Sequence, residues 1–417
     1  MKLNRILSIL IVAVVVVAAV IGGMKWSRLA RTPAEPRTPG AKLSLLVVGV
    51  EGLDLSILER LSREGRLPNI TRLMAEGATG VFANTGKTVP LELAWTSLVT
   101  GVAPEKLGMG GPVQVTKDGV TKTARAPLTP KVRTAETLWT VLSAKGSRVA
   151  VLNWPGTWPA EEVNGVMVGP YAIYLLEREH SSELGADPSK GVYPASERAV
   201  LDPLIRGIEG TTRGDLSEFV NLDSKLGLEA LVGKTYEVLA LAVAGDRSML
   251  RLARRTADGA GAQDMFVFLS GLDSVTARFW HYAHPADVML EKAGERGRGL
   301  LEGQNETLGA TIDRYYEATD AMIGELTPMV RDDGTIAIIA SHGYAGLEYD
   351  ESGNPKLGAN MWSGEGLWIL KGPRSAKGAR TSAGTLLDVA PTIAAAADIA
   401  LPPGIDGKVR EEMLVPR

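Results

Sequence analysis

The chain has 417 residues, a nearly balanced charge with 45 basic and 48 acidic side chains, and no cysteine. The balanced charge indicates no nucleic-acid surface, so we expect no nucleic-acid partner. The lack of cysteine excludes disulfides, thiolate metal sites and cysteine nucleophiles. Histidine is also scarce, at four residues, and a histidine-rich two-zinc centre would use most of them.

The first predicted element is a membrane-spanning helix at residues 6–24. A short basic tail, residues 1–5, precedes this nearly unbroken apolar run, and a basic cluster with Trp26 follows it. A helix of this length spans about 28 Å, close to the roughly 30 Å hydrocarbon core of a bilayer. The run exceeds the usual apolar region of a signal peptide, about 7–15 residues, so we favour an uncleaved anchor over a cleaved signal peptide.

Two signals disagree on the orientation of this anchor. More positive charge follows the apolar run than precedes it, which taken alone places the body in the cytoplasm. A very short tail before a large domain is more typical of export, so we expect a single-pass inner-membrane protein with a periplasmic body. Residues 25–42, basic and then proline-rich, are interpreted as a linker that separates the body from the bilayer.

Residues 43–417 are predicted to form one α/β domain. Leu43–Val50 is an apolar, β-branched run of the kind found in strands buried on both faces of a parallel sheet. Similar runs recur at Ser147–Leu152, Met265–Leu269, Thr335–Ala340 and Leu367–Leu370. Helical stretches alternate with them, at Leu55–Glu64, Ile70–Glu76, Ala135–Lys145, Thr311–Leu326 and Thr385–Ala397. This alternation predicts a three-layer α/β/α sandwich with a mostly parallel central sheet.

The carboxyl ends of the predicted strands are where a functional site is expected in such a sheet. The residues that directly follow each strand are therefore the site candidates. The stretch at about 171–261 is charged, glycine-rich and weakly patterned, and we predict a cap or insertion there, on the same face of the sheet.

Several segments, in order, resemble the alkaline-phosphatase superfamily, and within it the type I phosphodiesterase/nucleotide pyrophosphatase-like proteins. VVGVEGLDLSILERL and GRLPNITRLMAEGATG are similar to the family's opening strand and helix, and AWTSLVTGVAPEKLGM to the stretch after its nucleophile. The match continues with TLWTVLSAKGSRVAVLNWPGTWP, FWHY, RYYEATDAMIGEL, SHGY and LLDVAPTI. This resemblance implies an alkaline-phosphatase-like fold from Leu43 to the C-terminus. It also implies phosphoric ester hydrolysis with two divalent metals about 4 Å apart and a Thr or Ser nucleophile.

The first two matched positions depart from the family's pattern. Glu51 stands where the family has a metal-binding Asp, and its carboxylate is one methylene further from the backbone. Leu91 stands at the nucleophile position, and leucine neither attacks phosphorus nor binds a cation. A shifted nucleophile among Thr88, Thr96 and Ser97 is the alternative, which we disfavour because misplacement of a reacting group is costly.

The remaining matched positions depart further. Asp273 is kept, but the family's His four residues later is Ala277. The family's Asp-His-Gly becomes Ser341-His342-Gly343, and its last His aligns with Trp362. The resemblance leaves Glu51 and His342 on one metal and Asp273 alone on the other, fewer ligands than zinc or manganese needs. We therefore expect no cofactor, or at most one weakly bound divalent metal, zinc or manganese.

Each surviving residue also has a purely structural interpretation. His342 can be a core histidine bonded to backbone or to Glu51, and Glu51 can pair with His342 or another cation. Asp273 can cap the helix that contains Val275–Tyr282. The predicted pocket residues Trp95, Asn153 and Trp280 either line a substrate-like cavity or, for the tryptophans, fill the volume that metals and water would occupy.

Two functions are favoured by these patterns. The first is a membrane-anchored, catalytically inactive member of the superfamily that acts as a binding or scaffold module at the cell envelope, with an envelope protein or a lipid-like ligand as partner. The second is a divergent phosphodiesterase or phosphatase with one metal on Glu51 and His342 and water as nucleophile. A structural spacer without a pocket is the third and least favoured.

Overall fold

The computed structural model describes residues 42–84, 89–117, 120–125, 128–170, 188–205, 210–284, 294–344, 363–382 and 384–416. The predicted anchor at residues 6–24 lies outside these ranges, as do residues 25–41 of the linker, Thr88 and Trp362. Among the described helices, none combines the length and the apolar character needed to cross a membrane.

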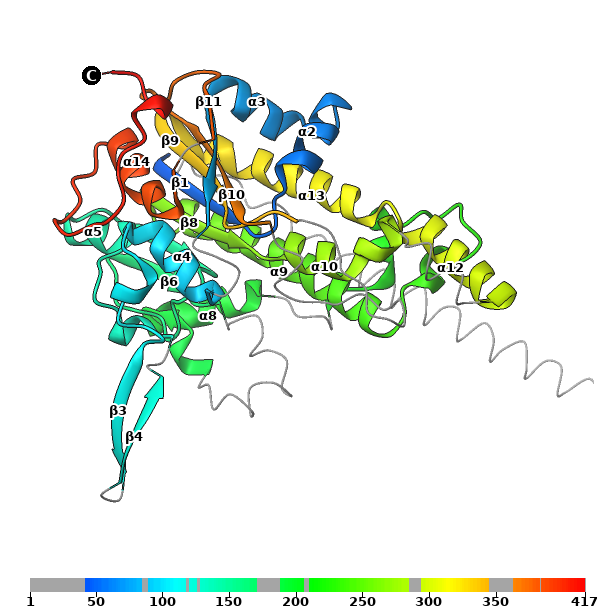
Figure 1. The fold of residues 1–417 in the computed structure, drawn as a ribbon, viewed down its shortest axis with the longest axis horizontal. Helices are drawn as coiled ribbons and strands as arrows, with labels where there is room; N and C mark the ends of the chain where they lie inside the picture. The colour runs from blue at the N-terminus through cyan, green and yellow to red at the C-terminus, as the bar shows by residue number, and fades with distance from the viewer. Residues whose placement is uncertain are drawn as a thin grey trace, which may run out of the picture. The chain divides into compact units, whose positions relative to one another are not determined.

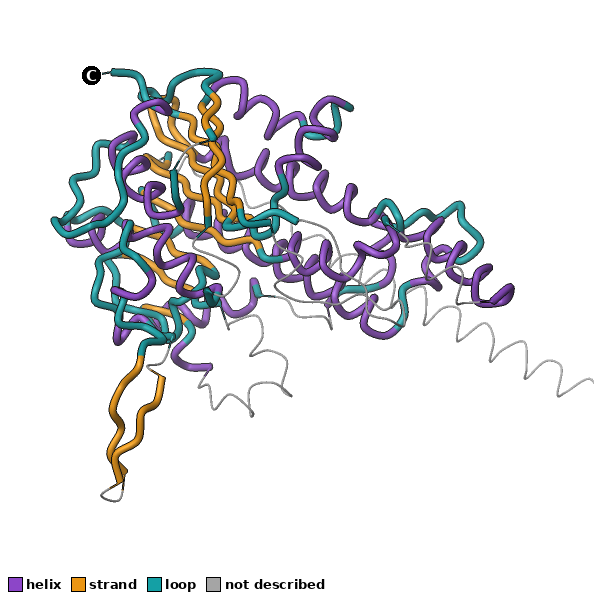
Figure 2. Tube along the Cα trace, in the orientation of Figure 1, coloured by secondary structure: helices purple, strands orange, loops and turns teal. Residues whose placement is uncertain are grey.

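A large, mostly parallel sheet forms the centre of the described domain (Figures 1 and 2). Within the described ranges it has nine strands, in the order β11-β2-β10-β9-β1-β8-β5-β6-β7. The five central strands are parallel: β9 (Val330–Ala340), β1 (Leu43–Val50), β8 (Asp264–Leu269), β5 (Val149–Leu152) and β6 (Gly165–Val168). The antiparallel pairings involve β10 (Glu365–Lys371), with β9 and β2 (Ala78–Ala83), and β7 (Val192–Tyr193), with β6. The short β11 (Arg380–Thr381) pairs parallel with β2. The sheet is therefore mostly parallel, as predicted from the sequence.

Helices cover both faces of the sheet because successive side chains of a buried strand point to opposite sides. In β1, Leu46 and Val48 pack under one helical layer, whereas Leu45 and Val47 pack under the other. The first layer contains α2 (Leu55–Arg63), α3 (Pro68–Glu76), α9 (Gly233–Asp258), α10 (Gly271–Ala283) and α13 (Thr311–Leu326). The second contains α4 (Leu91–Thr100), α5 (Leu138–Ala144) and α14 (Val389–Ala396).

The remaining elements are peripheral to the sandwich. They are α8 (Arg198–Leu201), α12 (Gly294–Leu308), which contacts α10, and a hairpin of β3 (Pro112–Lys117) and β4 (Val120–Arg125) that forms a separate two-stranded sheet (Figure 2).

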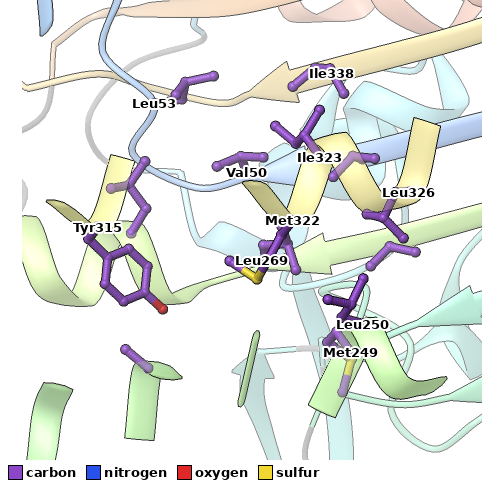
Figure 3. Close-up of a cluster of buried hydrophobic side chains, with 14 of the residues drawn as sticks. Val50, Leu53, Met249, Leu250, Leu269, Tyr315, Met322, Ile323, Leu326 and Ile338 are labelled. Atoms are coloured by element: carbon purple, nitrogen blue, oxygen red, sulfur yellow. The ribbon is translucent and has the colours of Figure 1, made fainter. Parts of the chain in front are cut away.

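Figure 3 shows the core between the sheet and its first helical layer. Met322, Ile323 and Leu326 point from α13 toward strand residues such as Val50 and Leu269. All five are buried, Met322 the least. Each such side chain stabilises the fold by roughly 1.5–3 kcal/mol. This packing fixes the ends of β1 and β8, where the site candidates follow.

The range at about 171–261, predicted as a cap or insertion, contains the helix α9. This 26-residue helix packs against β5, β8 and α10, so it is part of the helical layer and not a cap. Its buried residues lie on several of its sides and include Gly245 and Asp246. The sequence therefore lacks the single apolar stripe by which an amphipathic helix is recognised. Residues 171–187 of the same range lie outside the described residues.

Candidate functional site

Glu51 directly follows β1, at the carboxyl edge of the parallel strands. The residue is 2% exposed, and its backbone N–H donates to Leu269 O of β8 at 3.1 Å, which holds it in line with the sheet. The next residue, Gly52, has a φ of 79°, and a Cβ there would lie 3.0 Å from the Cα of Asp273. Glycine thus lets the turn after β1 approach α10 closely. This approach brings Glu51 and Asp273, predicted from distant parts of the sequence, to one place.

The carboxylate of Glu51 is held by protein donors on both of its oxygens. Ser341 Oγ donates to Oε1 at 2.5 Å, and His342 Nε2 lies 3.0 Å from the same oxygen. Trp95 Nε1 donates to Oε2. A buried carboxylate is stable only when its charge and lone pairs are compensated, and these three side chains supply that compensation.

Trp95 fills the space beside β1 on the sheet face opposite α10. It is fully buried, and its ring packs edge-on against Phe268 and Trp154, with centroid distances of 4.8 and 5.2 Å. Gly49 of β1 makes room for it, because a Cβ there would lie 2.8 Å from the rings of both Trp95 and Phe268. Trp95 is one turn of α4 after Leu91, so the helix that would carry a nucleophile carries an indole donor to Glu51.

His342 lies between two carboxylates. Its Nε2 is 3.0 Å from Glu51 Oε1 and 3.7 Å from Asp273 Oδ1, and its Nδ1 is 3.2 Å from Gly343 O. Tyr344 OH donates to Asp273 Oδ1 at 2.5 Å and to Asp273 O at 2.8 Å. The predicted set of Glu51, Asp273 and His342 is thus assembled in the fold, with Tyr344 as a fourth member.

The charges in this cluster shift its pKa values. Burial opposes the charged imidazolium, but attraction and hydrogen bonding to Glu51, together with Asp273, raise the pKa of His342 above its usual value. Burial also raises the pKa of Asp273, although His342 and the Tyr344 hydroxyl oppose that shift. When protonated, the His342 ring supplies between Glu51 and Asp273 the attraction that a metal cation would provide.

Asp273 does not cap its helix. It is the third residue of α10, whose N-cap position is Ser270, and the first amides are satisfied from α9 instead. Asp246 Oδ1 accepts from Ser270 N and Gly271 N, both at 3.2 Å, and its Oδ2 accepts from Tyr315 OH at 2.9 Å. The capping interpretation of Asp273 is therefore wrong. The cap comes from a residue 24 positions earlier in the chain than Ser270.

The other predicted positions are spread around the cluster. Leu91 is 38% exposed at the first turn of α4, and Ala277 is half-buried one turn after Asp273. Trp280 stacks on the Tyr344 ring at 5.7 Å. Asn153 is buried after β5 and lines a cavity there. Trp362, predicted at the last metal position, lies outside the described residues.

Two residues of the cluster and its support, Tyr344 and Asp246, were missed by the sequence interpretation. Trp95 was predicted either to line a cavity or to fill volume; it is fully buried, and its bond to Glu51 was not predicted. Tyr344 lies two residues after His342 in the SHGY segment, and this short spacing could have placed it at the site. Asp246 had none, because nothing in its local sequence relates it to α10.

The donor set does not fit the two-metal centre that the resemblance implies. Both oxygens of Glu51 already accept from protein side chains, and Ser341 supplies a hydroxyl where the family has a carboxylate. Within the described ranges, no group of three or more His, Asp or Glu side chains is arranged to hold a metal ion. The cluster is built as a hydrogen-bonded and charge-paired network.

A central parallel sheet with a polar cluster at the carboxyl ends of its strands defines an α/β protein of the alkaline-phosphatase-like class. The chain belongs to the type I phosphodiesterase/nucleotide pyrophosphatase family, whose model matches residues 45–368. This membership confirms the predicted alkaline-phosphatase-like α/β fold, whereas the N-terminal transmembrane helix stays a prediction. A search of curated proteins gave no match.

Solved structures with similar folds share little sequence with the chain. An inactive form of murine ectonucleotide pyrophosphatase/phosphodiesterase 5, in complex with AMP, is 10% identical, with a TM-score of 0.49, over 90% of this chain and 100% of that one. A phosphonoacetate hydrolase from Sinorhizobium meliloti is 17% identical, with a TM-score of 0.42, over 78% of this chain and 62% of that one. A phosphonate monoester hydrolase from Silicibacter pomeroyi is 12% identical, with a TM-score of 0.42, over 89% of this chain and 76% of that one.

Proposed function

We propose that the protein is a catalytically inactive member of its family that serves as a binding or scaffold module. The observation that carries this proposal is the occupied carboxylate of Glu51. Its oxygens accept from Trp95 and Ser341 and face His342, so a metal would have to displace two buried donors and separate Glu51 from His342. Loss of those buried contacts would leave polar groups unpaired, which costs roughly 1–3 kcal/mol each.

The nucleophile position supports the same proposal. Leu91 has no group that can attack phosphorus, and its side chain is partly exposed. It is the first residue of α4, the helix that contains Trp95. Activation of a nucleophile requires a hydroxyl, thiol, amine or carboxylate next to a base or metal. Leu91 supplies none of these groups at the family's nucleophile position, and the fold without them there retains a scaffold for binding.

The proposed location is the cell envelope. The apolar run at residues 6–24, with basic residues on both sides, is the basis for an inner-membrane anchor with the body on the periplasmic side. Partners in this setting are an envelope protein or a lipid-like ligand. Fusion of a reporter enzyme that is active on only one side of the membrane, placed after residue 417, tests the orientation.

The proposal predicts no metal-dependent phosphodiester cleavage. We expect the purified full chain with added zinc or manganese to release p-nitrophenol from bis(p-nitrophenyl) phosphate no faster than the His342→Ala variant. We also expect a substoichiometric metal content after desalting, measured by elemental mass spectrometry. Turnover that requires metal and disappears in His342→Ala would contradict the proposal.

That contrary result would favour the second candidate, a divergent hydrolase with a single metal. One observation supports this candidate: the three residues lie together, with His342 Nε2 at 3.0 Å from Glu51 Oε1 and 3.7 Å from Asp273 Oδ1, although their side chains would have to rearrange to hold a cation. It requires the Trp95 and Ser341 contacts to open. A stoichiometric metal lost in His342→Ala would identify it.

A further inference from the structure

A cavity of about 220 Å³ lies next to the Glu51 cluster, at the carboxyl ends of β5 and β8. Ser270 and Ser274 line it from the start of α10, while Asp273 between them points to Tyr344. One wall is a stripe of α9, formed by Val238, Leu241, Ala242 and Gly245. These four residues are spaced so that they share one helical face. The cavity and the cluster therefore lie on two sides of the same helical turn.

Among the described residues that line the cavity, none carries a charge. The α9 wall is apolar, and the polar groups are the Asn153 amide and the hydroxyls of Ser270 and Ser274, gathered at the strand ends. A phosphate or carboxylate placed here would lose hydration without gaining a counter-charge. The lining thus matches a neutral molecule with an apolar body and one polar end.

Asn153 provides the polar anchor of this cavity. It is 5% exposed, and its φ of 60° is a left-handed conformation that asparagine tolerates better than most residues. Its backbone N–H donates to Val168 O at 2.7 Å, and its Nδ2 donates to Phe268 O at 3.1 Å. Among the residues that the structure describes, none donates to its Oδ1. This oxygen is not among the buried side-chain atoms that lack a partner, so it is open at the cavity and available to a ligand.

We infer that this cavity binds a neutral molecule whose apolar part lies against α9 and whose hydroxyl or amide N–H donates to Asn153 Oδ1. A cavity of about 150 Å³ is enough to hold benzene, so this one accommodates a ring or short alkyl chain with one polar substituent. The inference rests on the proposed binding role, for which it supplies a site and a ligand class.

Fluorine NMR titration of the full chain with para-fluorobenzyl alcohol tests this assignment. We expect saturable binding with a dissociation constant on the order of 1 mM, as is typical of so small a ligand. The anion para-fluorobenzoate should bind at least about tenfold more weakly, because the described lining offers it no cation. Asn153→Gly keeps the left-handed backbone but removes the acceptor. This variant should weaken binding of the alcohol by about fivefold and leave the affinity for para-fluorotoluene unchanged.

Two variants close the cavity in different ways. Ala242→Leu fills it from the α9 wall, and Ser274→Trp covers it from an exposed position at its edge. Both should abolish saturable binding, while Ala144→Leu, on the exposed end of α5, should bind as the wild type does. Binding that is unchanged in Ser274→Trp and Asn153→Gly, or equal affinity for alcohol and benzoate, would overturn the inference.

This outcome is separate from that of the proposed function. Absence of saturable binding in a chain that also lacks hydrolase activity would remove the ligand site and leave the inactivity standing. Saturable binding in a chain that cleaves bis(p-nitrophenyl) phosphate would support the ligand site and contradict the proposed inactivity.

Discussion

Trp95→Ala is expected to lower the free energy of unfolding by about 5 kcal/mol. Removal of a fully buried tryptophan leaves a cavity that costs about 3–5 kcal/mol, and Glu51 Oε2 also loses its donor. Folded domains are stable by only about 5–15 kcal/mol, so the variant should be close to unfolding. Urea denaturation followed by circular dichroism measures the change.

A double-mutant cycle separates the hydrogen bond from the packing. Trp95→Phe keeps most of the ring but removes the donor, and Glu51→Gln removes the charge that the donor satisfies. We expect a coupling free energy of about 1–2 kcal/mol between the two changes. Trp139→Phe is the matched control, because Trp139 is equally buried but donates to Glu161 at 2.7 Å. Equal coupling of Glu51→Gln to both tryptophans would show that Trp95 does not specifically satisfy Glu51.

The second large effect concerns Asp246, which joins α9 to the start of α10. Asp246→Ala should lower the free energy of unfolding by about 3 kcal/mol or more, because two backbone amides and the Tyr315 hydroxyl lose a buried acceptor. Since α10 carries Asp273, the change should also loosen the Glu51 cluster. Unfolding by urea at pH 5 gives the stability, and hydrogen exchange of the α10 amides gives the local effect.

Asp246 also predicts a specific pH dependence. Burial raises its pKa from 3.8 to about 7, against the opposing effect of Tyr315 and the two amides. Between about pH 4 and pH 7 the folded chain keeps a proton that the unfolded chain releases. The contribution of Asp246 is therefore complete below pH 4 and declines as the pH rises to 7, by at most about 4 kcal/mol.

Asp246→Asn is the matched variant for this effect. Its amide oxygen can accept from the helix amides, and its NH₂ can donate to Tyr315 OH. We expect it to be more stable than the wild type at pH 8 and to show a flatter stability profile from pH 4 to pH 7. An unchanged profile would mean that Asp246 is ionised throughout this range.

The sequence determined the fold through local patterns. Apolar runs such as Leu43–Val50 and the helix at Thr311–Leu326 were located because burial on both faces, or on one helical stripe, leaves a periodic signal. The N-cap of α2 by Asp54 is equally local, because a cap acts over two or three residues, here on Ser56 and Ile57. The helix α9 was missed since its buried residues do not follow one stripe.

The substituted positions at the site also came from the sequence, through its resemblance to the family, because each is defined by its place in a matched segment. The tertiary structure decided what those substitutions accomplish. Trp95 reaches Glu51 across 44 positions, Tyr344 reaches Asp273 across 71, and Asp246 caps α10 from another helix. A contact between distant segments depends on how the layers pack, and the packing is a property of the whole domain that no local pattern encodes.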